Sequence, residues 1–418
     1  MKDTLRLIAA GAIGNVLEWY DFAIYGYFAF SIGQNFFPKS DPVAQVLAAF
    51  GVFAVGYLMR PFGGALTGTI ADRYGRQAGL TFSVVAMAVP TFLVGLLPGY
   101  DTIGIMAPVL LTLLRMVQGL AIAGECTTSF TFMIEHAPLG RRGLVGALSS
   151  ASAGIGMLLG SGGGTFMASL LTVDQLHQWG WRVPFLLGLG VGIIGFLLRR
   201  GIHGTIPDPR QQAGKSPLHA ILAQDKRLLL RLAGVAAFGA VSFYLMFLYV
   251  VTWLQTIDGV APVRALGINT VSMIAMIPVT MLAGWLSDRM GRKPILMAGV
   301  LLGGIGAFPF LWLMHHSNPA LILAGQFGFV LSVGTALGVQ PSLMVEATPP
   351  AIRCTVIALG FNLSFGLLGG LSPLAAAWLV QRTDMDLTPA YMIMAAAALS
   401  FVVLLTFERR TSLAAATS

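Results

Sequence analysis

Residues 68–76 read GTIADRYGR, and residues 284–292 read GWLSDRMGR. The two stretches share glycine at the first and eighth positions, aspartate at the fifth, and arginine at the sixth and ninth. Each polar stretch stands between two long apolar segments. A motif that returns in the same setting indicates that the chain contains an internal repeat.

A second set of residues recurs at nearly the same separation. Its members are Glu135, Pro138 and Arg142 in the first copy, and Glu346, Pro349 and Arg353 in the second. We therefore predict two homologous six-helix halves, residues 1–200 and 227–418. Residues 201–226 contain several prolines and charged residues and are predicted to form a cytoplasmic linker.

The composition is that of a protein whose main solvent is lipid. Of the 418 residues, 56% are hydrophobic and only 10% are charged, and the mean hydropathy is +0.80. A soluble domain carries about 25% charged residues, so this chain has too few to coat a surface that faces water.

A membrane-spanning helix needs about 20 mostly apolar residues. Twelve stretches meet this condition: 7–30, 43–66, 79–98, 104–130, 144–170, 181–199, 229–254, 266–286, 294–314, 319–344, 354–380 and 388–407. Helices are required because every backbone polar group inside a bilayer needs an internal partner. We predict an all-α polytopic membrane protein, built as two pseudo-symmetric six-helix bundles.

Lysine and arginine lie mostly on one side of these spans. Of the 25 such residues, those in loops on the opposite side are Lys39, Arg182, Arg264 and Arg382. This bias places both termini in the cytoplasm and accounts for the net charge of +8 without a nucleic acid partner. We expect a monomeric, multi-pass protein of the cell (inner) membrane, surrounded by lipids.

One face of the first span carries polar side chains at membrane depth. At 100° per residue, Asn15, Glu18, Asp21 and Tyr25 fall within an arc of about 120°. Charged groups at this depth are functional candidates by default. Two carboxylates three residues apart repel each other, which favours protonation of one of them. We predict that at least one of the pair Glu18 and Asp21 carries the transported proton; a permanent clamp between helices is the alternative.

The fourth span carries Arg115, Gln118 and Glu125 on one face. Arginine stays protonated, so Arg115 needs a partner, and Glu18 or Asp21 is the first choice. Arg115 could act in proton coupling or bind a substrate carboxylate through two hydrogen bonds; the alternative is a structural ion pair. Glu125 is a candidate second proton site or inner-gate residue.

Candidate substrate-binding residues lie in both halves. They are Asn15, Trp19, Tyr25, Arg115, Gln118, Tyr244, Tyr249 and Asn362. Tyr249 and Trp253 are four residues apart and share a helix face. With Trp19 and Tyr25 they could form an aromatic cage for a quaternary ammonium group; an interfacial aromatic belt is the alternative.

Several motifs resemble those of known transporters. The repeated loop and Arg115-x-x-Gln118-Gly119 are similar to motifs of the major facilitator superfamily. A narrower resemblance, to the metabolite:proton symporter family, rests on Gly14-Asn15-x-x-Glu18-Trp19-Tyr20-Asp21-Phe22, Arg60-Pro61-x-Gly63-Gly64, Pro98–Gly104 and Trp179-Gly180-Trp181-Arg182-x-Pro184-Phe185. Residues 98–110 resemble the osmolyte symporters for proline and betaine.

The resemblance also implies a cytoplasmic latch, which holds the inner side closed while the carrier faces outward. Its expected members are Gly68, Asp72, Arg73, Gly75, Arg76, Glu135, Arg142, Asp288, Arg289, Arg292, Glu346 and Arg353. A carboxylate such as Asp288 can complement the partial positive charge at a helix N-terminus. Glu135 with Arg142, and Glu346 with Arg353, are expected as companions in this latch.

These features predict a secondary active transporter that works by alternating access. We expect proton-coupled symport of a small carboxylate-bearing metabolite, either an organic acid or a zwitterionic osmolyte such as proline or betaine. The alternatives are a uniporter or exporter of a small organic solute, a membrane-embedded enzyme, or a channel. The sequence contains no nucleotide-binding motif, catalytic constellation or metal-ligand spacing, so we expect no enzyme activity, no cofactor and no metal.

Overall fold

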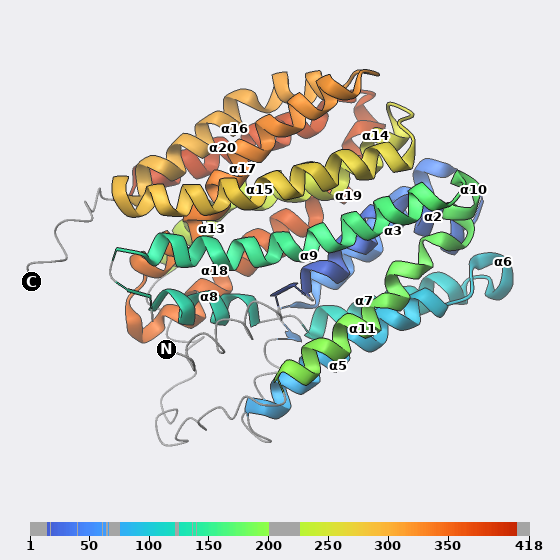
Figure 1. The fold of residues 1–418 in the computed structure, drawn as a ribbon, viewed down its shortest axis with the longest axis horizontal. Coiled ribbons are helices and arrows are strands. Elements are labelled where there is room, and N and C mark those ends of the chain that lie inside the picture. Colours follow the sequence, from blue (N-terminus) through green and yellow to red (C-terminus); the bar gives the residue numbers. More distant parts are fainter. Residues whose placement is uncertain are drawn as a thin grey trace, which may run out of the picture.

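The computed structural model is a long bundle of helices that run close to one common axis (Figure 1). It describes residues 15–16, 18–39, 41–60, 62–63, 66, 76–121, 125–135, 137–138, 140–199 and 226–407. Within these ranges the secondary structure is helical, without a strand. This is the outcome expected when each backbone hydrogen bond must close within its own segment.

All twelve predicted apolar stretches are helical over their described parts. In the first half the helices are residues 18–27, α2 (Ala29–Phe36), α3 (Pro42–Leu58), α5 (Arg76–Leu96), α7 (Met106–Ala121), α8 (Glu125–Glu135), α9 (Arg142–Leu170) and α11 (Arg182–Arg199). Short helices occupy the connections: α6 (Tyr100–Ile103), α10 (Val173–Gln175) and the π-helix η1 (Leu176–Gly180).

The second half has longer helices. They are α13 (Lys226–Tyr244), η3 (Leu245–Tyr249), α14 (Val250–Thr256), α15 (Pro262–Met290), α16 (Arg292–Met314), α17 (Pro319–Ala347), η4 (Pro350–Ile352), α18 (Arg353–Phe361), η5 (Asn362–Gly369), α19 (Gly370–Thr383) and α20 (Thr388–Leu405). Counting helices that run through a π segment as one, seven helices of the described chain are long and apolar enough to cross a membrane, and shorter apolar helices accompany them.

The seventh and eleventh spans are interrupted by π-helical segments that the sequence pattern did not predict. The segment η3 separates α13 from α14, and η5 separates α18 from α19. A π-helical turn holds more residues than an α-helical turn and therefore rotates the side chains that follow it. Face assignments made at 100° per residue fail beyond these points.

The two predicted halves meet through two helix pairs that the internal repeat relates to each other. In one pair α9 packs on α15, and in the other α3 packs on α19. Since α15 repeats α3, and α18 with α19 repeats α9, each pair is the counterpart of the other. The helices α8 and α9 also contact α17, and α8 contacts α18.

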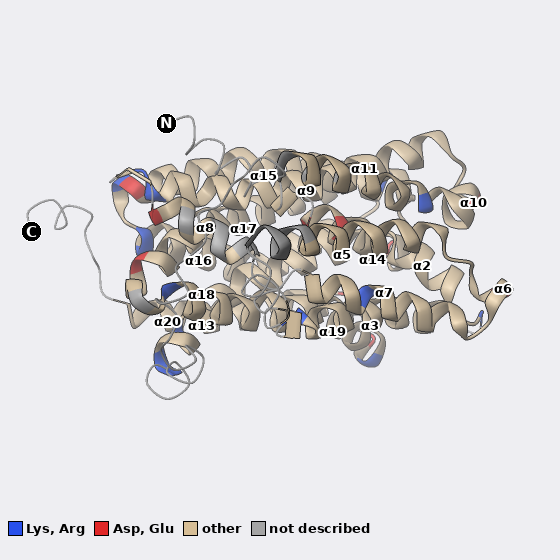
Figure 2. Cartoon of the chain, turned by 90° about the horizontal axis from the view of Figure 1, so that it is seen from below, with Lys and Arg blue, Asp and Glu red and all other residues tan. Residues whose placement is uncertain are grey.

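Charged residues gather at one end of the bundle, whereas its body is almost free of them (Figure 2). At this end α9 begins, α15 ends and α18 begins (Figure 1). It is the end that the distribution of lysine and arginine predicts to be cytoplasmic. Gly291, between α15 and α16, has a φ of +93°, a region that favours glycine. This turn explains the second glycine of the repeated motif.

Close contact between the halves at this end requires two glycines. A Cβ atom at Gly143 in α9 would lie 2.4 Å from the carbonyl oxygen of Gly284 in α15 and 2.5 Å from Ser287 Oγ. A Cβ at Gly284 would lie 2.4 Å from Ala147 Cβ. Backbones that approach so closely leave no room for a side chain.

We predict that Gly143→Ala forces α9 and α15 apart, because overpacking a tight contact costs about 1–3 kcal/mol. The readout is the alkylation rate of Ser150→Cys, in a variant without the two native cysteines. The Ser150 hydroxyl donates to the Leu337 carbonyl 2.7 Å away in α17, so separation of the halves should expose this position.

Gly163→Ala is the matched control, because Gly163 is in the same helix and its added Cβ would meet nothing within 4 Å. Equal alkylation rates in the Gly143→Ala and Gly163→Ala variants would show that the glycine contact does not hold the halves together.

Candidate substrate and proton site

A buried ion pair joins the first and fourth spans. Arg115 Nη1 lies 2.8 Å from Asp21 Oδ2, and the two side chains are 1% and 3% exposed. Gln118 Nε2 donates to Asp21 Oδ1 at 2.7 Å, and the Thr91 hydroxyl of α5 donates to the same oxygen. Asp21 is therefore the partner that Arg115 was predicted to need. Thr91 was not predicted, because a threonine in an apolar helix gives no distinctive signal.

A second buried ion pair lies one turn away on the first span. Arg60 Nη2 is 2.8 Å from Glu18 Oε1, with side-chain exposures of 2% and 5%. Arg60 had been noted only as part of a sequence motif and was not among the predicted site residues. Arg60 lies inside an apolar stretch, which is the signal that identified Arg115. That signal was sufficient to predict Arg60 as a site residue.

Aromatic rings enclose both guanidinium groups. The Phe22 ring centroid is 5.2 Å from Arg60 Cζ and 5.4 Å from Arg115 Cζ. Tyr25 lies 3.9 Å from Arg115 Cζ, and Tyr57 lies 4.5 Å from Arg60 Cζ. These cation–π contacts shield the charges from lipid and hold them within the first half.

The two pairs are well suited to link proton binding to conformational change. Protonation of Asp21 or Glu18 would leave a buried guanidinium without its counter-ion, and such a charge is strongly destabilising. The protonated site therefore favours a rearrangement that supplies new solvation or a new partner. A carrier that must couple a proton to movement requires this property.

A cavity lies between the two halves. The described residues that line it are Asn15, Trp19, Phe130, Ser149, Ser150, Ala153, Gly154, Phe243, Leu337, Gln340, Pro341, Phe361 and Phe365. They come from the first, fourth and fifth spans on one side and from the seventh, tenth and eleventh on the other. A site shared by two halves can bind solute in one arrangement and release it in another.

Aromatic rings form much of the cavity wall. Trp19 contacts Phe243 edge to face, with ring centroids 5.3 Å apart, and contacts Phe365 at 6.5 Å. Phe361 and Phe365 stack at 4.3 Å with an interplanar angle of 7°. This arrangement offers ring faces and edges to a bound molecule.

The predicted cage of Trp19, Tyr25, Tyr249 and Trp253 is not assembled. Tyr25 covers Arg115, Tyr249 contacts Phe50 at 5.6 Å, and the Trp253 ring packs on His315 while its Nε1 donates to the Asp386 carbonyl. Tyr249 and Trp253 thus contact separate surroundings, and neither is among the described residues that line the cavity. The aromatic residues at the cavity are instead phenylalanines together with Trp19.

Of the other predicted substrate-binding residues, some line the cavity and some do not. Asn15 and Trp19 line it, whereas Gln118 and Arg115 bind each other and Asp21. Tyr244 lies behind Trp19, at 6.0 Å between ring centroids, and shares a 2.5 Å hydrogen bond with Tyr57 across the halves. Asn362 Nδ2 donates to the Ala358 carbonyl within its own helix.

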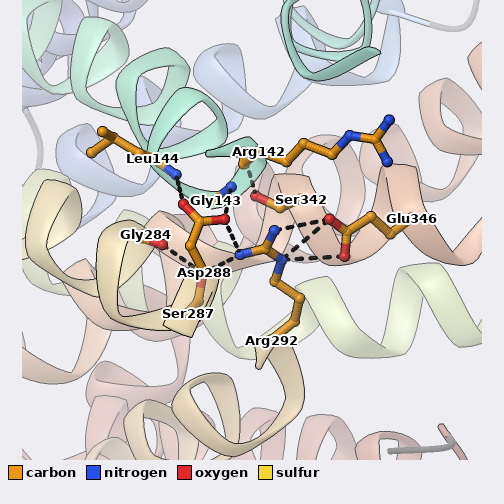
Figure 3. A network of polar contacts seen from close by, with 9 residues as sticks. All are labelled: Arg142, Gly143, Leu144, Gly284, Ser287, Asp288, Arg292, Ser342 and Glu346. Atoms are coloured by element: carbon orange, nitrogen blue, oxygen red, sulfur yellow. Dashed lines mark hydrogen bonds and ion pairs between the residues drawn. The ribbon is translucent and has the colours of Figure 1, made fainter. Parts of the chain in front are cut away.

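Asp288 is the centre of a polar network at the predicted cytoplasmic end, where the sequence predicts a latch (Figure 3). Its carboxylate accepts hydrogen bonds from the backbone N–H groups of Gly143 at 2.8 Å and Leu144 at 2.9 Å, at the start of α9. This is the predicted interaction with a helix N-terminus. Arg292 Nη1 donates to Asp288 at 2.7 Å, and Arg292 Nη2 lies 2.9 Å from Glu346.

The charged pairs that the structure contains at this end differ from the expected ones. Glu135 pairs with Arg353 across the two halves at 2.5 Å, and Glu346 pairs with Arg292. The side chain of Arg142 extends away from the Asp288 network (Figure 3), and its carbonyl accepts from Ser342. Sequence proximity favoured pairs within one half, but the packing of α8 against α18 brings the second half closer.

The structure describes only some of the other residues that are predicted for the latch. Arg289 lies over the Trp285 ring, 3.8 Å from its centroid. Gly68, Asp72, Arg73 and Gly75 lie outside the described residues. Arg76 and Glu125 begin α5 and α8, but their side chains are not among those described.

Comparison with known proteins agrees with this architecture. The family model described as Major Facilitator Superfamily matches residues 11–361 and 266–417. The chain belongs to the major facilitator superfamily. The motifs that resemble those of metabolite:proton symporters agree with the identity of two curated relatives.

The Proline/betaine transporter of Escherichia coli (strain K12) is 33% identical over 416 residues, covering 96% of this chain and 83% of the relative. The Glycine betaine/proline/ectoine/pipecolic acid transporter of Dickeya dadantii (strain 3937) is 34% identical over 411 residues, covering 95% and 82%.

Solved structures show the same fold. A proton:xylose symporter bound to 6-bromo-6-deoxy-D-glucose superposes with a TM-score of 0.75 at 18% identity, covering 97% of this chain and 95% of that one. The inward-open xylose transporter of E. coli gives a TM-score of 0.73 at 17% identity, with 98% of each chain covered.

We predict that Arg60→Gln lowers the free energy of unfolding by about 3–5 kcal/mol, because it removes the guanidinium that is paired with the buried Glu18 carboxylate. The double variant Glu18→Gln/Arg60→Gln should recover most of this loss, since it removes both charges. Thermal unfolding in detergent measures the difference. If the double variant is no more stable than Arg60→Gln, the two side chains are not energetically coupled.

We also predict that Glu135→Arg loosens the latch by placing two positive charges together, and that Glu135→Arg/Arg353→Glu restores it. Hydrogen–deuterium exchange at the first amides of α9 and α18 measures the opening. Exchange should rise in the single variant and return close to the parent value in the charge swap. Unchanged exchange in the single variant would contradict a latching role for this pair.

Proposed function

We propose that this major facilitator is a proton-coupled symporter of small zwitterions of the proline and betaine type. One observation carries the proposal: every described residue that lines the cavity between the halves is uncharged. The two buried arginines of the first half, Arg60 and Arg115, are already paired with Glu18 and Asp21. The cavity therefore suits a solute without net charge.

Electrostatics separates a zwitterion from an organic acid. A dicarboxylate would bring uncompensated negative charge into a buried site, and such burial is costly unless a cation is supplied. Arg115 was the candidate anchor for such a substrate, but it is bound to Asp21 and Gln118 and does not line the cavity. A zwitterion brings both charges and needs only local partners.

The cavity wall provides partners for both ends of a zwitterion. Aromatic faces attract alkylammonium groups by cation–π interaction, and rings of Trp19, Phe243, Phe361 and Phe365 are present. The indole N–H of Trp19 can donate a charge-assisted hydrogen bond to a carboxylate. The solutes that give the curated relatives their names, proline, betaine, ectoine and pipecolic acid, are compatible with this wall.

We further propose a topology and a transport cycle. The two halves, residues 1–200 and 227–418 joined by the linker 201–226, alternate about the cavity in the cell inner membrane, with both termini in the cytoplasm. The Asp288 latch and the Glu135–Arg353 pair close the cytoplasmic side. Asp21 and Glu18 bind the proton, and its release restores the ion pairs and closes the cycle.

Uptake into proteoliposomes tests the function. With an inward proton gradient, proline and glycine betaine should accumulate above equilibrium, and an uncoupler should abolish the accumulation. Succinate and α-ketoglutarate should neither accumulate nor compete. Accumulation of a dicarboxylate without a zwitterion, or uptake indifferent to the uncoupler, would overturn the proposal.

A role of Asp21 in proton coupling predicts that its substitution affects uphill uptake and substrate exchange differently. Asp21→Asn should lose uphill uptake while retaining exchange of substrate across the membrane, because the amide oxygen can still accept from Gln118 and Thr91 whereas the side chain can no longer bind and release a proton. Asp41→Asn is the matched control: Asp41 caps α3 by accepting from the Val43 N–H, and asparagine caps a helix equally well. Parent-like accumulation by Asp21→Asn would remove this residue from the proton path.

A further inference from the structure

Asn15 presents a carbonyl oxygen that no described residue satisfies. Its Nδ2 donates to the Ser149 carbonyl at 3.0 Å and to Ser152 Oγ at 2.9 Å. The Ser152 hydroxyl donates in turn to the Ser149 carbonyl, so Ser152 Oγ can only accept from Asn15. These bonds fix the orientation of the Asn15 amide, because the flipped form would set its oxygen against two acceptors. The free Oδ1 is thus a defined acceptor.

A second buried amide faces the same cavity from the other half. Gln340 in α17 is 2% exposed, and its Oε1 has no partner within the described chain. Its Nε2 reaches only Met344 Sδ, at 3.9 Å, and thioether sulfur is a weak acceptor. Gly239 leaves the space that this amide occupies, since a Cβ there would lie 2.8 Å from Gln340 Oε1.

A donor stands beside these acceptors. Trp19 follows Asn15 by one helical turn and also lines the cavity, and its Nε1 has no acceptor in the part of the chain that is described. A buried polar atom without a partner needs an explanation. The three that belong to residues lining this cavity would be satisfied by a ligand that carries N–H donors for the two amides and an acceptor for the indole.

We propose that Asn15 and Gln340 determine specificity between two classes of zwitterion, in an inference that rests on the proposed function. The two amide oxygens bind an ammonium group that carries N–H, as in the secondary amine of proline. A quaternary ammonium has no N–H to donate, so its binding depends on the aromatic rings alone. One cavity thereby recognises each class with a different set of side chains.

Variants with opposite effects on the two classes test this assignment. Gln340→Met keeps the size of the side chain and removes the acceptor, and Asn15→Leu does the same in the first half. We expect the ratio of proline to glycine betaine uptake to fall about ten-fold in each variant, the size of effect expected for one buried hydrogen bond to a charged group. Phe365→Leu should change the ratio in the other direction.

The ratio is measured in the same membranes, so reduced folding or expression cancels. Gln326→Met is the matched control: Gln326 is a buried amide of the same helix whose Nε2 donates to the Met246 carbonyl, and it does not line the cavity. Its variant should keep the parent ratio. An equal loss of both substrates in Gln340→Met and Asn15→Leu would make these amides structural and overturn the inference.

A ligand series supplies a second, independent readout. Proline, N-methylproline and N,N-dimethylproline keep the ring and the carboxylate while the nitrogen loses its hydrogens one by one. Competition against labelled glycine betaine by proline should be weaker in Gln340→Met than in the parent, whereas competition by N,N-dimethylproline, which has no N–H, should be the same in both. A parent that transports both zwitterions but ranks the series identically to this variant would refute the specificity role. A parent that transports neither zwitterion would refute the proposed function instead.

Discussion

Neutralisation of charge inside the membrane is the constraint on which the rest of this structure depends. Arg60 and Arg115 cannot lose their protons, so each is held against a carboxylate of the first span, Glu18 or Asp21. The Phe22 ring between them completes the enclosure. These charges are thereby confined to one half of the protein. A single proton added to either carboxylate neutralises one member of an ion pair.

The same pairing determines the character of the cavity. Because the guanidinium groups are engaged elsewhere, the wall shared by the two halves consists of aromatic rings and uncharged polar groups. In the proposed cycle, the solute and the proton therefore bind at neighbouring but separate places. The Tyr57–Tyr244 hydrogen bond crosses between the halves, and Tyr57 also lies against Arg60, so the two places are in physical contact.

At the predicted cytoplasmic end, a different chemistry holds the halves together. The Asp288 carboxylate binds the N-terminus of α9, which is possible only because Gly143 and Gly284 allow the two backbones to meet. Gly284 and Asp288, both members of the repeated motif, thus contribute to the same contact with α9. At this end the side chains of Glu346 and Glu135 are 30% and 35% exposed, so water competes for their ion pairs more readily than for the buried pairs of the first half.

The sequence alone determined the helical spans, the internal repeat, the need of Arg115 for a carboxylate of the first span (Glu18 or Asp21) and the helix-terminus role of Asp288. Each follows from local properties: a run of apolar residues, a repeated motif, or an arginine that needs a counter-ion. Only the tertiary structure decided that Arg60 binds Glu18, that Glu135 pairs with Arg353 across the halves, and that phenylalanines rather than Tyr249 and Trp253 line the cavity. Those outcomes depend on the π-helical segments and on which helices meet, and neither is encoded in the spacing of residues along one helix.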